Sequence, residues 1–201
     1  MMTCLEVGTT CVYREKIPSD ISSLQNMATE AERGFVANVK SLHRQAEILL
    51  TRIMLREIFG DDVVYSHDEN GAPIVNRDCN ISVSHCADEV VIAVDEMCHI
   101  GIDVELWRGQ LHRVAPRVLS VAELAYYNAP QGLLQAWTAK EAIYKAVALP
   151  GLDFASEIKL PIMDGDAIAL AERGGIAKKV VLFYVELSPE KVLTLARCES
   201  M

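Results

Sequence analysis

The segment Gly101–Glu105, which reads GIDVE, is the part of this chain that most constrains its fold. Its apolar residues predict a buried strand, and successive side chains of a strand point to opposite faces. Asp103 and Glu105 are two residues apart and therefore share one face of the pleat. The sequence thus predicts a pair of carboxylates aimed at one point.

A second segment, Trp137–Lys145, reads WTAKEAIYK and has the pattern of a helix. Glu141 and Lys145 are four residues apart, so they stand one above the other on one side of that helix. If this helix meets the strand, three carboxylates and a lysine converge, a set suited to Mg²⁺ holding a phosphorylated ligand. The ordinary alternative is a solvated strand end and a surface ion pair contributing about 0.3 to 0.5 kcal/mol.

A third motif, Ser82–His85, precedes the other two. The S-x-S-H turn, the G-x-D-x-E strand and the W-x-x-K-E-x-x-x-K helix, in this order, resemble the phosphopantetheinyl transferase superfamily, specifically its larger, monomeric Sfp-type. The likeness covers roughly residues 40 to 160, and its further matches are His43-Arg44-Gln45, Arg52, Asn70-Gly71-Ala72-Pro73 and Gly151-Leu152-Asp153-Phe154.

The resemblance implies an enzyme, a holo-[acyl-carrier-protein] synthase, that transfers the 4'-phosphopantetheine group of coenzyme A to a serine of an acyl or peptidyl carrier protein. It implies a Mg²⁺ ion held by Asp103, Glu105 and Glu141. Lys145 would lie against the charge that builds on the leaving phosphate. Lys140 lies about 100° around the helix from Glu141, and it either contacts the ligand or is solvated.

The general base is open among Glu123, Glu141 and a metal-bound water. Ser120 and Glu123 also form the pattern of a capping box, in which the glutamate side chain binds a backbone amide at the start of a helix. A carboxylate tied to an amide is a poorer proton acceptor, so the two roles compete.

The nucleotide end of coenzyme A is assigned by the same resemblance. Ser84 and His85 would contact the adenosine 3'-phosphate or neighbouring groups, and Arg44 and Arg52 would grip that phosphate through forked hydrogen bonds. The alternatives are a structural histidine and solubilising charges on an apolar helix. Ala72 stands where the family turn usually has lysine, which removes one cation from this site.

The net charge of -9 argues against a general nucleic-acid binder and requires basic residues to be concentrated locally. No acid occurs between Leu106 and Ala122, and this stretch is the predicted carrier-docking surface, near Arg108, Leu111, Arg113 and Arg117. An ordinary solvated helix face is the alternative.

The predicted fold is α+β, in two similar halves, residues 1–97 on the nucleotide side and residues 98–201 with the magnesium and catalytic motifs. Each half reads as a helix packed on a small antiparallel sheet, and the resemblance implies that a pseudo-twofold relates them. Helices are predicted over 22–59, 121–127 and 131–149, with an amphipathic one near Leu111. Strands are predicted at 63–66, 80–84, 90–95, 99–106, 157–160, 167–171, 178–187 and 192–198, and residues 1–20 read as irregular or strand-like.

With 201 residues and 51% hydrophobic content, the chain can bury a sizeable core. Its longest apolar run, Val180 to Val185, is far shorter than the roughly 20 residues of a membrane helix. The N-terminus lacks the layout of a secretory signal, and the six cysteines form no C-x-x-C pair. We therefore expect a cytoplasmic protein with reduced cysteines, and by resemblance a monomer.

Two other functions remain open at this stage. One is a different Mg²⁺-dependent enzyme acting on phosphates or pyrophosphates, although such sites usually concentrate their acids on one helix. The other is a non-catalytic carrier-protein binder, although all the proposed metal carboxylates are present.

Overall fold

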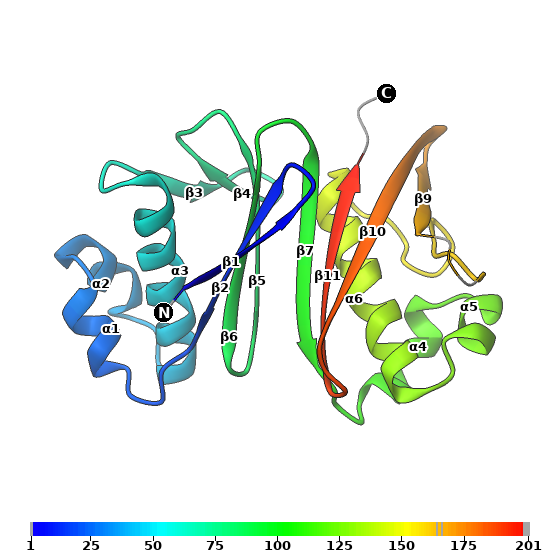
Figure 1. Ribbon diagram of the computed structural model, residues 1–201, viewed down its shortest axis with the longest axis horizontal. Helices are drawn as coiled ribbons and strands as arrows, with labels where there is room; N and C mark the ends of the chain where they lie inside the picture. Colours follow the sequence, from blue (N-terminus) through cyan, green and yellow to red (C-terminus); the bar gives the residue numbers. More distant parts are fainter. Residues whose placement is uncertain (1, 164, 166, 199–201) are drawn as a thin grey trace.

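The computed structural model describes residues 2–163, 165 and 167–198, which form an α+β fold of antiparallel sheets flanked by helices, as predicted (Figure 1). The first sheet has the order β1 (Thr3–Val7), β2 (Thr10–Lys16), β6 (Glu89–Asp95) and β5 (Asn80–Cys86). The second has the order β7 (His99–Leu106), β11 (Lys191–Cys198), β10 (Ile176–Ser188), β9 (Ile168–Arg173) and β8 (Ile158–Lys159). A hairpin of β3 (Tyr65–His67) and β4 (Pro73–Val75) forms a third sheet of two strands. Strands therefore come first in each half, and β1 and β2 lie in the segment 1–20 that reads as irregular or strand-like.

The prediction of one helix over residues 22–59 is also wrong. The structure has three helices there, α1 (Ser22–Met27), α2 (Glu30–Val36) and α3 (Leu42–Phe59). Thr29 begins α2 with a capping box to Glu32, and Ser41 accepts the Arg44 amide at the start of α3. Each cap satisfies amides that a continuous helix would have bonded internally, so each favours a new helix start.

The other helices match their predictions closely. They are α4 (Leu111–Val118), α5 (Val121–Tyr126) and α6 (Pro130–Val147). The predicted capping box of Ser120 and Glu123 is confirmed at the start of α5. Helix α6 stops before Leu149 because Ala148 adopts a left-handed conformation, with φ 48°.

The two sheets lie between the helices, with α1–α3 on one side and α4–α6 on the other (Figure 1). Helix α3 packs on the first sheet and α6 on the second, and each covers its own apolar core. A third core fills the space between the sheets, and it contains Val12, Val91, Ala93, Ile100, Ile102, Val104, Leu193 and Leu195. In β7, the alternate residues Ile100, Ile102 and Val104 point into this middle core. Asp103 and Glu105 therefore lie on the opposite face of the strand, which is the face that α6 covers.

Serine hydroxyls join the two sheets at their neighbouring edges, β5 and β7. Ser82 Oγ accepts the amide of Ile102 at 3.0 Å, and Ser84 Oγ accepts the amide of Val104 at 3.2 Å. Exposed strand edges carry unpaired amides. These two side chains satisfy such amides and hold the halves in register.

Helix α6 lies very close to β7. A Cβ atom at Gly101 would fall 1.9 Å from the carbonyl oxygen of Ala142 and 2.7 Å from the amide nitrogen of Ala146. Only glycine fits there, so Gly101 allows the strand and the helix of the two motifs to meet. Among the described residues, no helix is both long and apolar enough to cross a bilayer.

Candidate functional site

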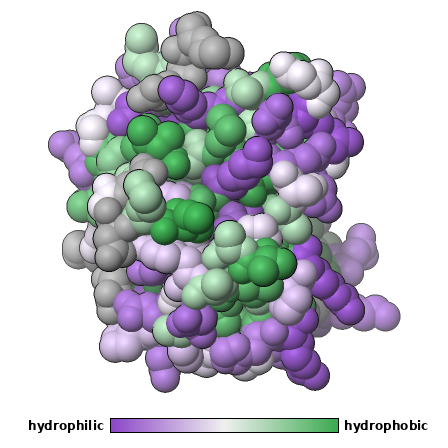
Figure 2. All heavy atoms as spheres, turned by 90° about the vertical axis from the view of Figure 1, so that its right-hand side faces the viewer, coloured by the Kyte–Doolittle hydropathy of each residue, from purple (hydrophilic) through white to green (hydrophobic). Residues whose placement is uncertain are grey.

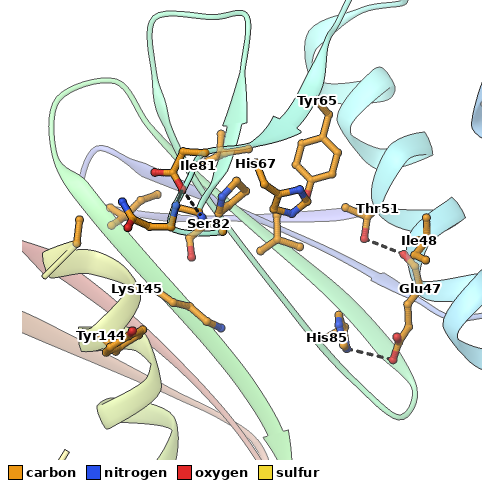
Figure 3. Close-up of a pocket in the computed structure, with 18 of the residues that line it drawn as sticks. Glu47, Ile48, Thr51, Tyr65, His67, Ile81, Ser82, His85, Tyr144 and Lys145 are labelled. Atoms are coloured by element: carbon orange, nitrogen blue, oxygen red, sulfur yellow. Dashed lines mark hydrogen bonds and ion pairs between the residues drawn. The ribbon is translucent and has the colours of Figure 1, made fainter. Parts of the chain in front are cut away.

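Two adjoining cavities lie where β5 and β7 meet the helices. The larger, about 550 Å³, is walled by α3, β5, the turn between β3 and β4, and the end of α6 (Figure 3). The smaller, about 230 Å³, is walled by β5, β7 and α6. Val83, His85 and Lys145 line both cavities, so an elongated ligand can reach from one into the other.

The smaller cavity contains the predicted acids. Asp103, Glu105 and Glu141 line it together with Lys145 and Trp137. The structure therefore brings the acids of the strand and the helix to one place. We call this cavity the acidic cavity and the other the larger cavity.

Asp103 is a buried residue that lines the acidic cavity. Its Oδ1 accepts hydrogen bonds from Ser84 Oγ and from Lys145 Nζ, both at 2.9 Å. Its Oδ2 is buried and has no hydrogen-bond partner. A buried polar atom left without a partner costs free energy, about 1–3 kcal/mol. This oxygen is therefore free to bind a cation.

The other two acids resist ionisation in the folded chain. Burial raises the pKa of Glu141, the charges of Asp103 and Glu105 raise it further, and Lys145 opposes them. Burial also raises the pKa of Glu105, against the opposing effect of Arg108. A divalent cation would relieve this repulsion, and carboxylate oxygens are the ligands that Mg²⁺ prefers, so the residues present fit the ion.

The three acids are not arranged as a tight ligand set. Glu105 makes two hydrogen bonds to Arg108 Nη2, at 2.7 and 2.6 Å. Among the described residues, the group whose donor atoms all lie within 4.8 Å of one another is Cys86, Asp88 and Glu89. A bound ion would therefore require the side chains of the acidic cavity to draw together.

The Cys86 group is better explained as an ion-pair network. Lys191 Nζ lies 2.7 Å from Asp88 Oδ1 and 2.6 Å from Glu89 Oε2, and Arg14 also pairs with Glu89. Burial raises the pKa of the Cys86 thiol to about 11, so it is protonated at neutral pH and is a poor metal ligand. The lysine supplies the positive charge that this group needs.

The larger cavity carries basic groups from two elements. Arg44 on α3 and His85 at the end of β5 lie side by side, with Arg44 Nη1 2.7 Å from His85 Nε2. Both contact the buried carboxylate of Glu47, as Figure 3 shows for His85. The predicted pair of Arg44 and His85 is thus brought together on one wall.

Arg52 lies about two helical turns further along α3, next to two aromatic rings. Its guanidinium stands 3.4 Å from the centroid of the Phe35 ring and 5.3 Å from that of Tyr65. Its Nε is buried and has no hydrogen-bond partner, and burial lowers its pKa. Aromatic stacking of this kind orients a guanidinium and leaves its edge free for an anion.

Ser84 is placed differently from the adjacent histidine. It is buried, and its hydroxyl is occupied by Asp103 and the Val104 amide. His85 is half-buried and faces both cavities. Ala72 and Gly71 of the β3–β4 turn also line the larger cavity, at the position where the missing lysine would stand.

Lys140 and Glu123 lie outside both cavities. Lys140 is fully buried, and its Nζ is 2.9 Å from Glu123 and 2.7 Å from the carbonyl of Phe154. Glu123 also accepts the amides of Ser120 and Leu160, both at 2.7 Å. The solvated alternative for Lys140 is therefore wrong. The structure does not bring either residue to the acids.

The predicted docking surface lies on α4 and the turn before it. Arg113 and Arg117 are exposed, and Arg108 is exposed but pairs with Glu105 at the rim of the acidic cavity. Leu111 does not belong to this surface, because it is buried against Leu134 and Val192. The neighbouring Val121 is 86% exposed. Figure 2 shows this side of the molecule, where apolar side chains form separate patches among polar ones.

Sequence reasoning missed several lining residues of the larger cavity, among them Glu47, Phe35 and Tyr65. Glu47 is the first of two acids in α3 and lies three positions after Arg44, and that spacing could have identified it. Phe35 and Tyr65 reach the cavity from separate elements, so no local pattern marks them.

Comparison with known proteins agrees with this geometry. Residues 99–195 match the family described as the 4'-phosphopantetheinyl transferase superfamily, a range that includes both the strand and the helix motif. This match spans just under half of the chain, and over that range the chain is similar to the superfamily. The chain is also similar to the 4'-phosphopantetheinyl transferase gsp of Aneurinibacillus migulanus, with 25% identity over 157 residues. The alignment covers 66% of this chain and 63% of that protein, so the chain spans less than two thirds of its relative's length.

Proposed function

We propose that this chain is an Sfp-type phosphopantetheinyl transferase, a holo-[acyl-carrier-protein] synthase, which moves the 4'-phosphopantetheine group of coenzyme A to a carrier-protein serine. The observation that carries the proposal is the adjacency of the two cavities. A basic, partly aromatic cavity suits a nucleotide, and the acidic cavity beside it suits a pyrophosphate with its Mg²⁺. Residues 1–97 would then provide the nucleotide side, and residues 98–201 the acids and the docking surface.

The proposed reaction is a displacement at phosphorus. The serine oxygen bonds to the phosphorus that carries the pantetheine arm, the bond to the bridging pyrophosphate oxygen breaks, and adenosine 3',5'-bisphosphate leaves with the electron pair. Mg²⁺, held by Asp103, Glu105 and Glu141, would neutralise the pyrophosphate and make the phosphorus more electrophilic. Lys145 lines both cavities, and its ammonium would stabilise the charge on the leaving phosphate.

The serine proton must pass to a base. Glu141 lines the acidic cavity, and a carboxylate that gives one oxygen to Mg²⁺ keeps its second oxygen to accept a proton. Glu123 is buried, with hydrogen bonds to Lys140 and two amides. We therefore propose Glu141 as the base, and a positioning role for Glu123 and Lys140, whose ion pair joins α5 to α6.

For the nucleotide end, we propose that Arg44, Arg52 and His85 bind the 3'-phosphate. Ser84 would act indirectly, by orienting Asp103. The carrier would dock on the exposed surface around Arg108, Arg113 and Arg117, which suits the acidic character of carrier proteins. The cytoplasmic location and the monomeric state stay predictions.

The test is a mass measurement on apo-carrier proteins incubated with this chain, coenzyme A and Mg²⁺. We expect the carrier to gain the mass of one phosphopantetheine group, and we expect Asp103→Ala or Glu141→Ala to abolish the gain. Glu57→Gln is the matched control, because it removes a carboxylate from an exposed position of α3. Hydrolysis of free nucleotides or pyrophosphates without transfer would favour another phosphate enzyme, and carrier binding without any mass gain would favour a non-catalytic binder.

A further inference from the structure

The buried carboxylate of Glu47 organises one wall of the larger cavity. Its side chain is 8% exposed, whereas those of Arg44 and His85 are 51% and 37% exposed. Arg44 Nη1 lies 2.8 Å from its Oε2, and its Oε1 is 3.1 Å from His85 Nδ1 and 3.2 Å from His43 Nε2. Figure 3 shows the pair of Glu47 and His85 bridging α3 and β5 across the cavity wall.

The distances also determine which atoms carry hydrogen. A guanidinium can only donate, and Arg44 Nη1 lies 2.7 Å from His85 Nε2, so this nitrogen accepts. The proton of the imidazole is then on Nδ1, which donates to Glu47. Burial lowers the pKa of His85, in agreement with a neutral ring. Arg44, Glu47 and His85 therefore form a closed triangle of hydrogen bonds.

The position of Glu47 in a cavity proposed to bind an anionic nucleotide requires a physical explanation. Its charge repels a phosphate, and at such a position it weakens binding unless it improves the geometry of the cations in front of it. Glu47 lies deeper than Arg44 and His85, so the groups that face the cavity are the basic ones. A free arginine side chain loses conformational entropy when a ligand fixes it, and a side chain that is already held loses less on binding.

We infer that Glu47 is a positioning residue, which holds Arg44 and His85 side by side as a preformed clamp for a phosphate monoester on a nucleotide. This inference rests on the proposed function, in which that group is the 3'-phosphate of coenzyme A. The clamp would distinguish coenzyme A from 3'-dephospho-coenzyme A, which has the same base, sugar, pyrophosphate and pantetheine arm. Lys145 from α6 and Asp103 from β7 also face His85, but they are paired with each other and do not replace Glu47.

The experiment measures the dissociation constants of coenzyme A and 3'-dephospho-coenzyme A by titration calorimetry on the whole chain. The variant is Glu47→Gln, which keeps the shape but removes the charge and turns an amide donor toward Arg44 or His85. We expect the dissociation constant for coenzyme A to rise about tenfold or more, and that for 3'-dephospho-coenzyme A to change less than about twofold. Glu57→Gln, on an exposed position of the same helix, should change neither.

A purely structural role for Glu47 would weaken both ligands equally, and that result would overturn the inference. Equal affinity of the wild-type chain for the two ligands would also overturn it. If Glu47→Gln does not fold, Glu47→Asp keeps the charge but withdraws it by one methylene, and the same selective loss is expected.

The mass assay on the same samples separates this inference from the proposed function. Transfer by the wild-type chain together with equal effects on both ligands would refute the clamp and leave the function intact. Selective loss of coenzyme A binding in a chain that transfers nothing to any carrier would support the clamp and refute the function.

Discussion

The negative charges of the neighbouring carboxylates in the acidic cavity destabilise the folded chain when no cation is bound. Glu141 is held near Asp103 and Glu105, and burial removes much of the water that would separate their charges. A carboxyl group whose pKa is raised in the folded chain stabilises the fold below its unfolded pKa, and this contribution is lost as the pH rises through the folded pKa. Perturbed groups of this kind are typical of functional sites.

We predict that Glu141→Gln stabilises the metal-free chain while it abolishes transfer. Without divalent cations, its melting temperature at pH 7 should exceed that of the wild type by about 1–3 °C, since about 1 kcal/mol corresponds to about 2–4 °C in a chain of this size. The difference should shrink as the pH falls toward 4, where Glu141 is protonated. Thermal unfolding in a chelator at several pH values measures it, and a lower melting temperature at pH 7 would contradict the assignment.

The surroundings of Ser84 and His85 differ in a way that the local sequence does not reveal. Ser84 and His85 are adjacent in the S-x-S-H motif and both line the acidic cavity, yet the serine is buried against Asp103, and of the two only the histidine also lines the larger cavity. Their separation follows from strand alternation, which sends neighbours to opposite faces. The motif predicted both residue types, but their hydrogen-bond partners lie on β7 and α3.

At the scale of elements, the contact of α6 with β7 builds the site. The absence of a side chain at Gly101 lets the helix backbone approach the strand, and Lys145 can then reach both Asp103 and the carbonyl of Ile102, each within 2.9 Å. The distance between the two elements therefore sets the distance between the two halves of the acidic cavity.

We predict that Gly101→Ala disrupts this contact. The new methyl group would lie 1.9 Å from a backbone oxygen, which cannot move away as a flexible side chain can. Overpacking should destabilise the chain by at least about 2 kcal/mol. Transfer should fall about a hundredfold even in molecules that stay folded, because a displacement of about 1 Å can have that effect. Denaturant unfolding and the mass assay measure the two effects.

Gly109→Ala is the matched control for this change. No heavy atom beyond its chain neighbours lies within 4 Å of a Cβ atom there, so we expect wild-type stability and activity. A Gly101→Ala chain as stable and active as this control would show that the close approach of α6 is not needed.

At the scale of the whole molecule, the two sheets must stay in register for the cavities to exist. Ser82 and Ser84 join them beside the cavities, and Lys191 on β11 joins them again through Asp88 and Glu89. The exposed basic surface lies on α4, on the same side as α6 (Figure 1). A macromolecule bound there would meet the acidic cavity at Arg108, which pairs with Glu105.

We predict that reversing Arg113 and Arg117 to Glu raises the Michaelis constant for the carrier about tenfold and leaves that for coenzyme A nearly unchanged. The effect should shrink as salt screens the charges. The matched control reverses two exposed lysines elsewhere in the chain, Lys16 and Lys179, to Glu, with the same change in net charge. Steady-state kinetics with each substrate varied would measure this, and equal effects on both Michaelis constants would exclude docking at α4.

The sequence by itself determined the residue types of the acidic cavity, the bounds of β7, the approximate extent of α6 and the α+β class. It could do so because hydrophobic periodicity and capping residues act over a few neighbouring positions. The split of the predicted helix over 22–59 was missed, although Thr29 and Ser41 are local signals for it.

Only the tertiary structure decided which faces meet. It joined β5 to β7 through serine hydroxyls, buried Leu111 and Lys140, and placed Glu47 behind Arg44 and His85. The physical reason is that periodicity indicates which side of an element is buried but not which distant element covers it. That choice depends on packing between segments far apart in the chain, such as the close approach that Gly101 permits.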